Sequence, residues 1–292
     1  MLRLGILCSG GLGQSILMEL NSKRQIEFVM TDKKSENIIT YCNKFKIPCF
    51  VGNPRRDKGY NYIKDKSVDV IVSINYLYLI EKDIIQHPRI LAFNIHGSLL
   101  PKYRGRTPHV WAIINNESET GITAHKIDVG CDTGAIIEQV KIKIDPEDTG
   151  FDILEKYRAK YLPLIDKVLK MIETNNVKSW FQNEDEATIF GKRTPEDGLI
   201  NWNWQKERIR NWVRAQSYPY PGAFTYYGNQ KVIIDKVEYS KLGFNGDMKN
   251  GLILKIEPKL VVKTPNGALV INKIRENYPN FELGKTFTNE DC

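Results

Sequence analysis

The chain has 292 residues, of which 41% are hydrophobic and 26% are charged, with 21 glycines and 13 prolines. This length fits two domains, and the composition is that of a packed globular protein rather than a disordered or fibrous one. No stretch approaches the roughly 20 apolar residues that a membrane span needs, so we expect no membrane partner. The formal net charge of +7 suits an anionic partner, and a nucleotide, a folate and tRNA fit it equally well.

Cysteine and histidine usage argues for an intracellular protein without a metal. The five cysteines are an odd number and include no C-x-x-C pair, so we expect neither a disulfide framework nor a zinc knuckle. The four histidines show no metal-ligand spacing, so no metal site is predicted. Residues 1–8 run directly into a strand-like pattern without the parts of an export signal. A cytoplasmic location is the simplest expectation.

Short apolar segments alternate with helical patterns through the first half of the chain. Several are too continuously apolar for a sheet with one wet face, which predicts a parallel sheet covered by helices. These segments are residues 2–8, 28–31, 48–51, 68–74 and 90–96. A long amphipathic helix is predicted over residues 151–173, with Thr149 and Asp152 in a capping arrangement at its start. The expected fold class is α/β with a Rossmann-like, mostly parallel sheet.

The pattern changes after this helix. Residues 175–195 are polar and aperiodic and are interpreted as a linker, and residues 205–216 as one short helix. Strand-like segments separated by Gly- and Asn-containing turns follow at 224–227, 231–237, 252–256, 260–263 and 268–274. They predict a smaller β-rich domain with the form of a partly open barrel. We expect an α/β domain that carries the site over residues 1–190 and the β-rich domain over residues 191–292.

A glycine-containing turn, Ser9-Gly10-Gly11-Leu12-Gly13, follows the first predicted strand. In α/β proteins a phosphate often binds at such a turn, and Asp32 at the end of the second strand resembles the acid that holds an NAD ribose. The G-x-G-x-x-G and G-x-x-x-x-G-K-[ST] patterns are both absent, which makes a nicotinamide enzyme a minor alternative. A tight strand-to-helix turn and a contact with a phosphate or a substrate edge both stay open.

Asn94 and His96 form the candidate site. Residues two apart on a strand point the same way, so these side chains should emerge together at the carboxyl end of the last parallel strand, where α/β sheets bind ligands. Asp132 is the candidate third member, because a loop carboxylate can orient an imidazole or favour its protonated form. Its loop lies between the strand-like segments 122–127 and 135–144, and a turn-making aspartate is an equal alternative. The G-x-S-x-G elbow is absent, so Ser98 has no special claim to covalent catalysis.

Three separated motifs resemble a known family. They are residues 93–105 (FNIHGSLLPKYRG), 121–128 (GITAHKID) and 132–137 (DTGAII), and they occur in the same order as in the catalytic core of enzymes that transfer a formyl group from 10-formyltetrahydrofolate. The resemblance implies this folate as the cofactor and Asn94, His96 and Asp132 as the catalytic trio. In that chemistry Asn94 would donate to the developing oxyanion, His96 would accept a proton or polarise the carbonyl, and Asp132 would hold His96 and help to relay protons.

The second half narrows the family. Residues 183–202 and 214–224 are similar to the formyltransferase half of the bifunctional UDP-4-amino-arabinose enzyme and to nucleotide-sugar N-formyltransferases, and the whole resemblance covers residues 1 to 230. Glycinamide ribonucleotide formyltransferases lack the second module, and folate dehydrogenases of this lineage continue into further domains. Methionyl-tRNA formyltransferases carry a basic insertion after the second strand, whereas residues 32–37 here pass quickly into a helical pattern.

We therefore expect an N-formyltransferase that acts on a nucleotide-linked amino-deoxysugar. The nucleotide is dTDP or UDP, the 4-amino position is favoured over the 3-amino position, and the formamido product serves surface polysaccharide synthesis, as in a lipopolysaccharide O-antigen. The alternative is a methionyl-tRNA formyltransferase, and a non-catalytic folate- or nucleotide-binding module is a distant third. Nucleic acid is not the expected partner, and relatives favour a homodimer.

The resemblance and the positions of the strand ends lead to a set of expected contacts. The pterin is expected against residues 73–80, and Arg104 is expected to face an anionic group. Aromatic residues of the second domain are expected to stack on the base, with packing between domains as the alternative for each. The folate contacts are Ile74, Tyr76, Leu77, Tyr78, Arg104 and Asp128. The sugar-nucleotide contacts are Ser9, Gly10, Gly11, Tyr76, Ser98, Arg104, Gly105, Thr107, Trp212, Tyr218 and Tyr220.

Overall fold

The computed structural model describes residues 2–276 and 278–288, which form two compact units. Unit 1 contains Gly121–Ile142, Lys156–Phe190 and the chain up to Gly105. Unit 2 contains Arg106–Thr120, Lys143–Glu155 and the chain from Gly191 onward. The predicted domain division stays a prediction. It shares the boundary after residue 190 with these units, but two segments that precede this boundary group with unit 2.

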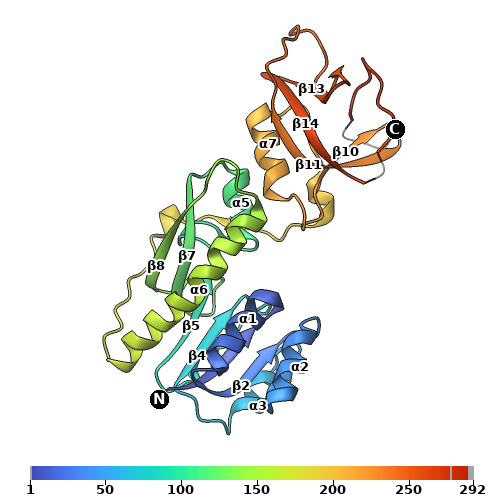
Figure 1. The fold of residues 1–292 in the computed structure, drawn as a ribbon. Helices are drawn as coiled ribbons and strands as arrows, with labels where there is room; N and C mark the ends of the chain where they lie inside the picture. Colours follow the sequence, from blue (N-terminus) through green and yellow to red (C-terminus); the bar gives the residue numbers. More distant parts are fainter. Residues whose placement is uncertain (1, 277, 289–292) are drawn as a thin grey trace. The chain divides into compact units, whose positions relative to one another are not determined.

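Unit 1 is built around a seven-stranded sheet with the order β3-β2-β1-β4-β5-β7-β8 (Figure 1). Its strands are β1 (Arg3–Cys8), β2 (Gln25–Thr31), β3 (Cys49–Val51), β4 (Val70–Ile74), β5 (Leu91–His96), β7 (Glu119–Lys126) and β8 (Ile136–Lys143). The helices between them are α1 (Gly10–Asn21), α2 (Glu36–Phe45), α3 (Lys58–Ile63) and α4 (Lys82–Gln86). β1 to β5 pair in parallel, and β7 runs antiparallel to β5. The expected α/β class with a mostly parallel sheet is confirmed.

Burial explains why the first strands read as continuous apolar runs. All five residues of β4 are buried, and so is β1 after its first residue, because a parallel sheet has helices on both faces. The hydrophobic core against this sheet consists of Leu7, Phe28, Met30, Ile63, Val68, Ile71, Ile84 and Ala92. This rigid centre carries the carboxyl ends of β1, β4 and β5, where the candidate site lies.

Unit 2 contains a five-stranded antiparallel sheet with the order β10-β11-β14-β13-β12. Its strands are β10 (Ala223–Tyr227), β11 (Gln230–Tyr239), β12 (Ile253–Lys255), β13 (Leu260–Thr264) and β14 (Gly267–Arg275). Two helices, α5 (Pro108–Ile114) and α7 (Lys206–Ala215), belong to the same unit. The expected smaller β-rich part is therefore confirmed.

Helix α6 (Gly150–Glu173) begins with the expected reciprocal cap. The amide of Thr149 donates to the Asp152 carboxylate at 2.9 Å, and the amide of Asp152 donates to Thr149 Oγ1 at 3.2 Å. Two backbone donors at the start of the helix, which no helical carbonyl can reach, are thereby satisfied. Among the described residues, no helix is long and apolar enough to cross a membrane.

The interpretation of residues 175–195 as a linker is wrong for most of the segment. Trp180 exchanges two backbone hydrogen bonds with Ile136, and β9 (Ile189–Phe190) pairs in parallel with β6 (Arg104–Gly105). Two short 3-10 helices, Glu184–Glu186 and Pro195–Gly198, complete the segment. Its contacts are made by backbone groups and polar side chains, which leave no hydrophobic period in the sequence.

A test of the sheet packing concerns Gly5, which pairs with Phe28 across β1 and β2. A Cβ on Gly5 would overlap the ring of the fully buried Phe28. Gly5→Ala should therefore destabilise the protein by about 1–3 kcal/mol in urea unfolding, and adding Phe28→Leu should recover part of that loss. Gly243→Ala, where nothing lies within 4 Å of the new Cβ, is the matched control. Wild-type stability of Gly5→Ala would contradict the packing.

Candidate active site

The site lies at the end of β5, where a buried strand turns into a loop. β4 flanks it on one side, with Ser73 opposite Asn94, and β7 flanks it on the other, with His125 opposite Asn94 and Thr123 opposite His96. The two neighbouring strands thus hold the backbone of both candidate residues. His96 is 7% exposed, so only one edge of its ring reaches the surface.

Asp132 reaches this strand end from the loop between β7 and β8. One carboxylate oxygen lies 3.4 Å from His96 Nδ1, and the other lies 3.5 Å from His125 Nε2. The amide of Gly105 donates to the same carboxylate at 3.0 Å. Asp132 has a φ of 57°, a left-handed conformation that a non-glycine residue keeps only when its surroundings hold it. Gln182 helps to hold it by donating to the Asp132 carbonyl oxygen at 2.8 Å.

The hydrogen bonds of His96 assign its tautomer. Nε2 lies 2.8 Å from the carbonyl oxygen of Tyr103, which can only accept, so Nε2 carries the proton. Burial lowers the pKa of His96 and outweighs the Asp132 carboxylate and the Tyr103 carbonyl, which raise it. The ring is therefore neutral near pH 7 and presents its Nδ1 lone pair toward Asp132. A proton taken up at Nδ1 would create an imidazolium between two acceptors.

Asp132 is ionised in this arrangement. Its burial acts to raise the pKa of the carboxyl, but His96, His125 and the Gly105 amide outweigh that effect and hold the pKa well below its ordinary range. The Gly105 amide donates to this carboxylate, and a proton taken up by either imidazole would add an opposite charge beside it. The carboxylate can therefore stabilise a positive charge that forms on His96 during a reaction.

His125 is the residue that the sequence analysis missed. Its Nδ1 lies 2.9 Å from the Lys126 carbonyl oxygen and donates to it, which leaves Nε2 to accept from Asn94 Nδ2 at 3.1 Å. This contact fixes the orientation of the Asn94 amide and leaves its second N–H free of partners among the described residues. A Cβ on Gly134 would overlap the same Lys126 carbonyl, so this loop needs glycine to pack here. The signal for His125 is its place opposite Asn94, which only the pairing of β5 with β7 reveals.

Arg104 is buried and has protein partners. The residue is 2% exposed, and its guanidinium donates to Glu184 at 2.7 and 2.8 Å and to Gln182 at 2.7 and 3.1 Å. The charge is thus already paired inside unit 1, and the expected contact of Arg104 with an anionic ligand stays a prediction. The pairing ties the loop after β5 to the segment that contains Gln182.

The other predicted residues of this loop have structural partners. Ser98 Oγ donates to the Lys102 carbonyl at 2.6 Å, and the Tyr103 amide donates to Thr188 Oγ1 at 2.8 Å. Gly105 has a φ of 95° and lies against the Phe190 carbonyl, where a Cβ would not fit. Gly105 thus contributes its amide to Asp132, and a direct contact of Ser98 or Gly105 with substrate stays a prediction.

The glycine turn after β1 borders a hollow of its own. Gly10 and Gly11 line a pocket of about 260 Å³ together with Lys34, Ser35 and Asn37. The Gly10 amide donates to Ser35 Oγ at 2.9 Å. Asn75 Nδ2 donates to the carbonyl oxygen of Ser9 at 3.1 Å and so joins the ends of β4 and β1. The turn is therefore braced from both sides, and its contact with a ligand stays a prediction.

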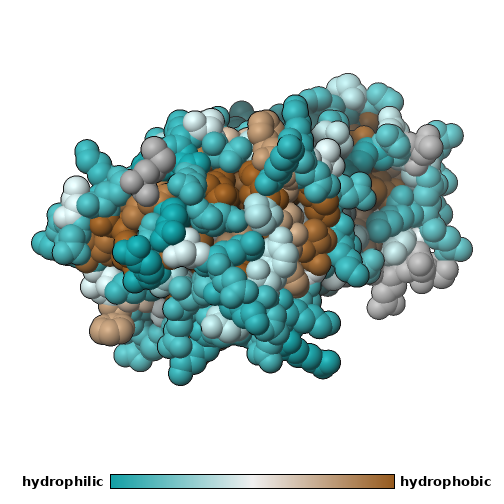
Figure 2. Space-filling model, turned by 90° about the horizontal axis from the view of Figure 1, so that it is seen from below, coloured by the Kyte–Doolittle hydropathy of each residue, from teal (hydrophilic) through white to brown (hydrophobic). Residues whose placement is uncertain are grey.

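The segment after β4 presents a mixed surface beside β5. Tyr76 has a buried hydroxyl without a hydrogen-bond partner among the described residues, and its ring packs on Tyr78 at 5.6 Å. Leu77 and Leu79 are 39% and 47% exposed. The side chain of Ile74 is fully buried, so only its backbone could meet a ligand. On the molecular face in Figure 2, hydrophobic residues likewise show between hydrophilic ones.

The remaining predicted contacts divide between the two units. Asp128 in unit 1 accepts from Gly130 and Thr133 and so shapes its own turn. In unit 2, Trp212 is 8% exposed and lies under Arg193 at 4.4 Å, which favours the packing alternative, and its stacking on a base stays a prediction.

Three more predicted contacts lie in unit 2. Tyr220 Oη meets His109 Nε2 at 3.0 Å, Tyr218 is 71% exposed, and the hydroxyl of Thr107 is buried without a hydrogen-bond partner among the described residues. Roles for these three residues stay predictions. The described parts of the chain contain no cluster of His, Cys, Asp or Glu that could hold a metal ion.

Two family models match the chain. One, described as formyl transferase, matches residues 6–165, and the other, described as formyl transferase C-terminal domain, matches residues 192–289. The chain is 35% identical over 264 residues to the bifunctional polymyxin resistance protein ArnA of Wigglesworthia glossinidia brevipalpis. That match covers 88% of this chain and 39% of the relative, so the chain spans well under half of the relative's length.

Two solved structures have a similar fold. One is an N-formyltransferase from Helicobacter canadensis in complex with folinic acid and dTDP-3-aminofucose, with a TM-score of 0.74 and 21% identity over 94% of this chain and 100% of that one. The other is WlaRD, a sugar 3N-formyl transferase in the presence of dTDP and 5-N-formyl-THF, with a TM-score of 0.73 and 22% identity over 95% of this chain and 99% of that one. Both have the same fold as this chain.

A test of the charge arrangement measures the titration of the imidazoles by NMR. Because the Asp132 charge raises the pKa of His96 against burial, Asp132→Asn should move that pKa further below its wild-type value. His109, whose pKa burial alone lowers to about 4, is the internal control and should titrate unchanged. A higher pKa of His96 in the variant would contradict the assigned roles.

Proposed function

The chain belongs to the formyl transferase family, and from that premise we propose that it transfers a formyl group from 10-formyltetrahydrofolate to the amino group of a nucleotide-linked amino-deoxysugar. The observation that carries the proposal is the grouping of Asn94, His96 and Asp132 at one strand end. It combines an amide donor, a neutral imidazole and an ionised carboxylate, which are the groups that acyl transfer between two nitrogens needs.

The residues after β4 fit the folate. The buried hydroxyl of Tyr76 lacks a partner among the described residues, and the exposed Leu77 and Leu79 provide apolar surface beside it. A pterin is a flat ring with polar edges, so one unpaired hydroxyl and a half-exposed apolar segment suit it. This segment follows the strand next to β5, which supports an orientation of such a cofactor with its reacting end toward Asn94 and His96.

The acceptor is inferred from relatives and from sequence. The two similar solved proteins contain dTDP or a dTDP-linked aminosugar, and residues 183–202 and 214–224 are similar to the nucleotide-sugar branch. A dTDP- or UDP-linked 4-amino- or 3-amino-dideoxysugar is the proposed substrate, and the formamido product would enter the synthesis of a surface polysaccharide such as an O-antigen. The net charge of +7 suits the diphosphate of such a substrate.

Three residues of this chain have separate roles in the proposed reaction. When bound, 10-formyltetrahydrofolate supplies the formyl group. The free N–H of Asn94, oriented by His125, donates to the oxygen on which negative charge develops, a contribution of about 3–4 kcal/mol. Asp132 relays the proton of the attacking amine to His96 Nδ1, because Nδ1 faces this carboxylate and Tyr103 keeps the other nitrogen protonated. The carboxylate then stabilises the imidazolium, which returns the proton by the same route to the tetrahydrofolate nitrogen as the bond from that nitrogen to the formyl carbon breaks. No covalent enzyme intermediate is required.

The proposed substrates indicate the location of the enzyme in the cell. Folates and nucleotide sugars are intracellular metabolites, so we place the protein in the cytoplasm, where its cysteines would stay reduced. The four cysteines within the described residues are free thiols, which agrees with that location. A homodimer is the proposed assembly, and its mass by light scattering would test it.

The proposal is tested with a panel of acceptors. The protein is incubated with 10-formyltetrahydrofolate and, in separate reactions, with dTDP- and UDP-linked 4-amino and 3-amino sugars and with initiator methionyl-tRNA. Mass spectrometry should detect the gain of one formyl group on at least one amino sugar and none on the tRNA. Asn94→Ala should lower kcat by about 100- to 1,000-fold. Formylation of the tRNA alone would contradict the proposed amino-sugar substrate and would indicate a methionyl-tRNA formyltransferase.

A further inference from the structure

A pocket in unit 2 contains a buried lysine without an acidic partner. The pocket has a volume of about 570 Å³ and is lined by Asn203, Gly246, Met248, Lys249, Asn250, Lys263 and Pro265. All of these residues belong to the chain after Gly191, so the pocket is complete within one unit. Its volume lies within the range of roughly 300–1,000 Å³ that is typical of small-molecule sites.

Lys263 lines this pocket from strand β13. It is the fourth residue of β13, a strand whose five residues are all buried, and it is 2% exposed. Its backbone is held by two hydrogen bonds of 2.9 Å, from its amide to Leu252 and from Gly251 to its carbonyl. These two bonds fix the position of the strand, so the ammonium group stays in the pocket.

The ammonium group has only neutral partners within the described residues. Lys263 Nζ donates to Asn250 Oδ1 at 2.9 Å and, over a long 3.5 Å, to the Thr264 carbonyl, and the ring of Phe244 lies 4.9 Å away. Two other buried charges are paired with an opposite charge, Arg104 with Glu184 and Asp235 with Arg275. The buried Asp32 is instead held by hydroxyl and amide donors, which stabilise an anion. A buried cation without a counter-charge costs several kcal/mol, so such a group calls for an anion.

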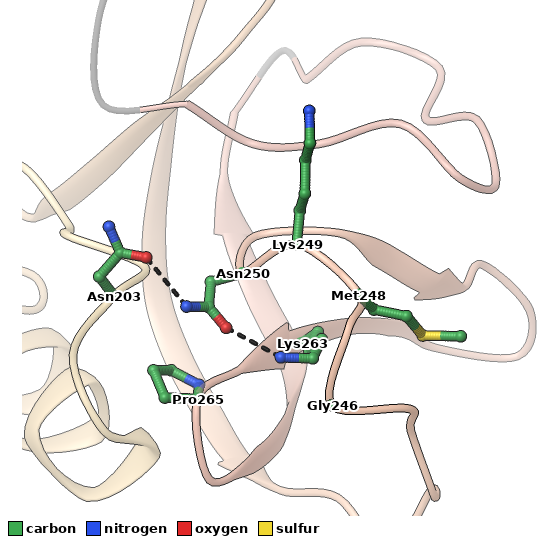
Figure 3. Close-up of a pocket in the computed structure, with 7 residues that line it drawn as sticks. All are labelled: Asn203, Gly246, Met248, Lys249, Asn250, Lys263 and Pro265. Carbon is green, nitrogen blue, oxygen red and sulfur yellow. Dashed lines mark hydrogen bonds between the residues drawn. The ribbon is translucent and has the colours of Figure 1, made fainter.

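Neutral amides surround the lysine on the side of Asn250. Figure 3 shows Asn250 between Lys263 and Asn203, with its oxygen toward the lysine and its nitrogen toward Asn203. Because lysine can only donate, the Asn250 oxygen must face it, and the Asn250 amide nitrogen then donates to Asn203 Oδ1 at 2.9 Å. This chain of amides supplies no negative charge to the lysine. Met248 and Pro265 add apolar lining.

We propose that this pocket is a binding site for a small organic anion, whose oxyanion group pairs with Lys263 Nζ, while its apolar part rests on Met248 and Pro265. The shared chemistry is an oxyanion, which either a phosphate or a carboxylate provides. The site is separate from the residues of the proposed reaction, since Asn94, His96 and Asp132 all belong to unit 1.

Calorimetric titration of the full chain tests the proposal, with inorganic phosphate as the phosphate probe and glutarate as the carboxylate probe, at equal ionic strength set with chloride. At least one probe should bind, and Lys263→Met should weaken that binding by about tenfold or more. Lys255→Met, which removes an exposed lysine of the neighbouring strand β12, should change it by less than about twofold. If only phosphate or only glutarate binds, the result shows whether the oxyanion group that the pocket takes is a phosphate or a carboxylate.

A second variant keeps the test decisive if Lys263→Met does not fold. Asn250→Asp places a carboxylate where Asn250 Oδ1 already meets Lys263 Nζ, so it should abolish binding of the probe while raising the midpoint of thermal unfolding without the probe. The absence of binding by wild-type protein to either probe would overturn the proposal. Unchanged binding in Lys263→Met or in Asn250→Asp would overturn it too.

Discussion

The buried carboxylate of Asp132 is the group on which the rest of the candidate site depends. It faces His96 with one oxygen and His125 with the other, at 3.4 and 3.5 Å, and it accepts from the Gly105 amide. Removing it would leave two imidazoles and an amide around an empty position. The carboxylate thus connects the end of β5, the end of β7 and the loop after β5.

Polar contacts of the surrounding residues keep this carboxylate in place. Gln182 donates to the carbonyl oxygens of Asp132 and Gly134, and its own amide oxygen accepts from Arg104. Arg104 in turn pairs with Glu184. A segment that looks like a spacer in the sequence therefore holds the loop of Asp132 in its left-handed conformation, and this explains why a polar stretch packs so closely on the sheet.

Sequence reasoning reached the strands and part of the site because both rest on local patterns. The alternation of side chains along a strand is enough to place Asn94 and His96 together, and continuous burial is enough to predict the parallel sheet. Sequence reasoning cannot establish which strands become neighbours in the sheet, so it missed His125. It also cannot show that Arg104 meets Glu184, a partner 80 residues away, because nothing local distinguishes a paired arginine from a free one.

The central claim is that neutral His96, held between Tyr103 and Asp132, is the base in formyl transfer. The most direct measurement compares kcat for formyl transfer to the amino sugar that the panel identifies in wild-type protein, His96→Ala and His87→Ala, which removes a histidine bonded to the Lys66 carbonyl. The account predicts a loss of kcat of about 100-fold or more in His96→Ala and none in His87→Ala. Turnover of His96→Ala near the wild-type value would contradict it.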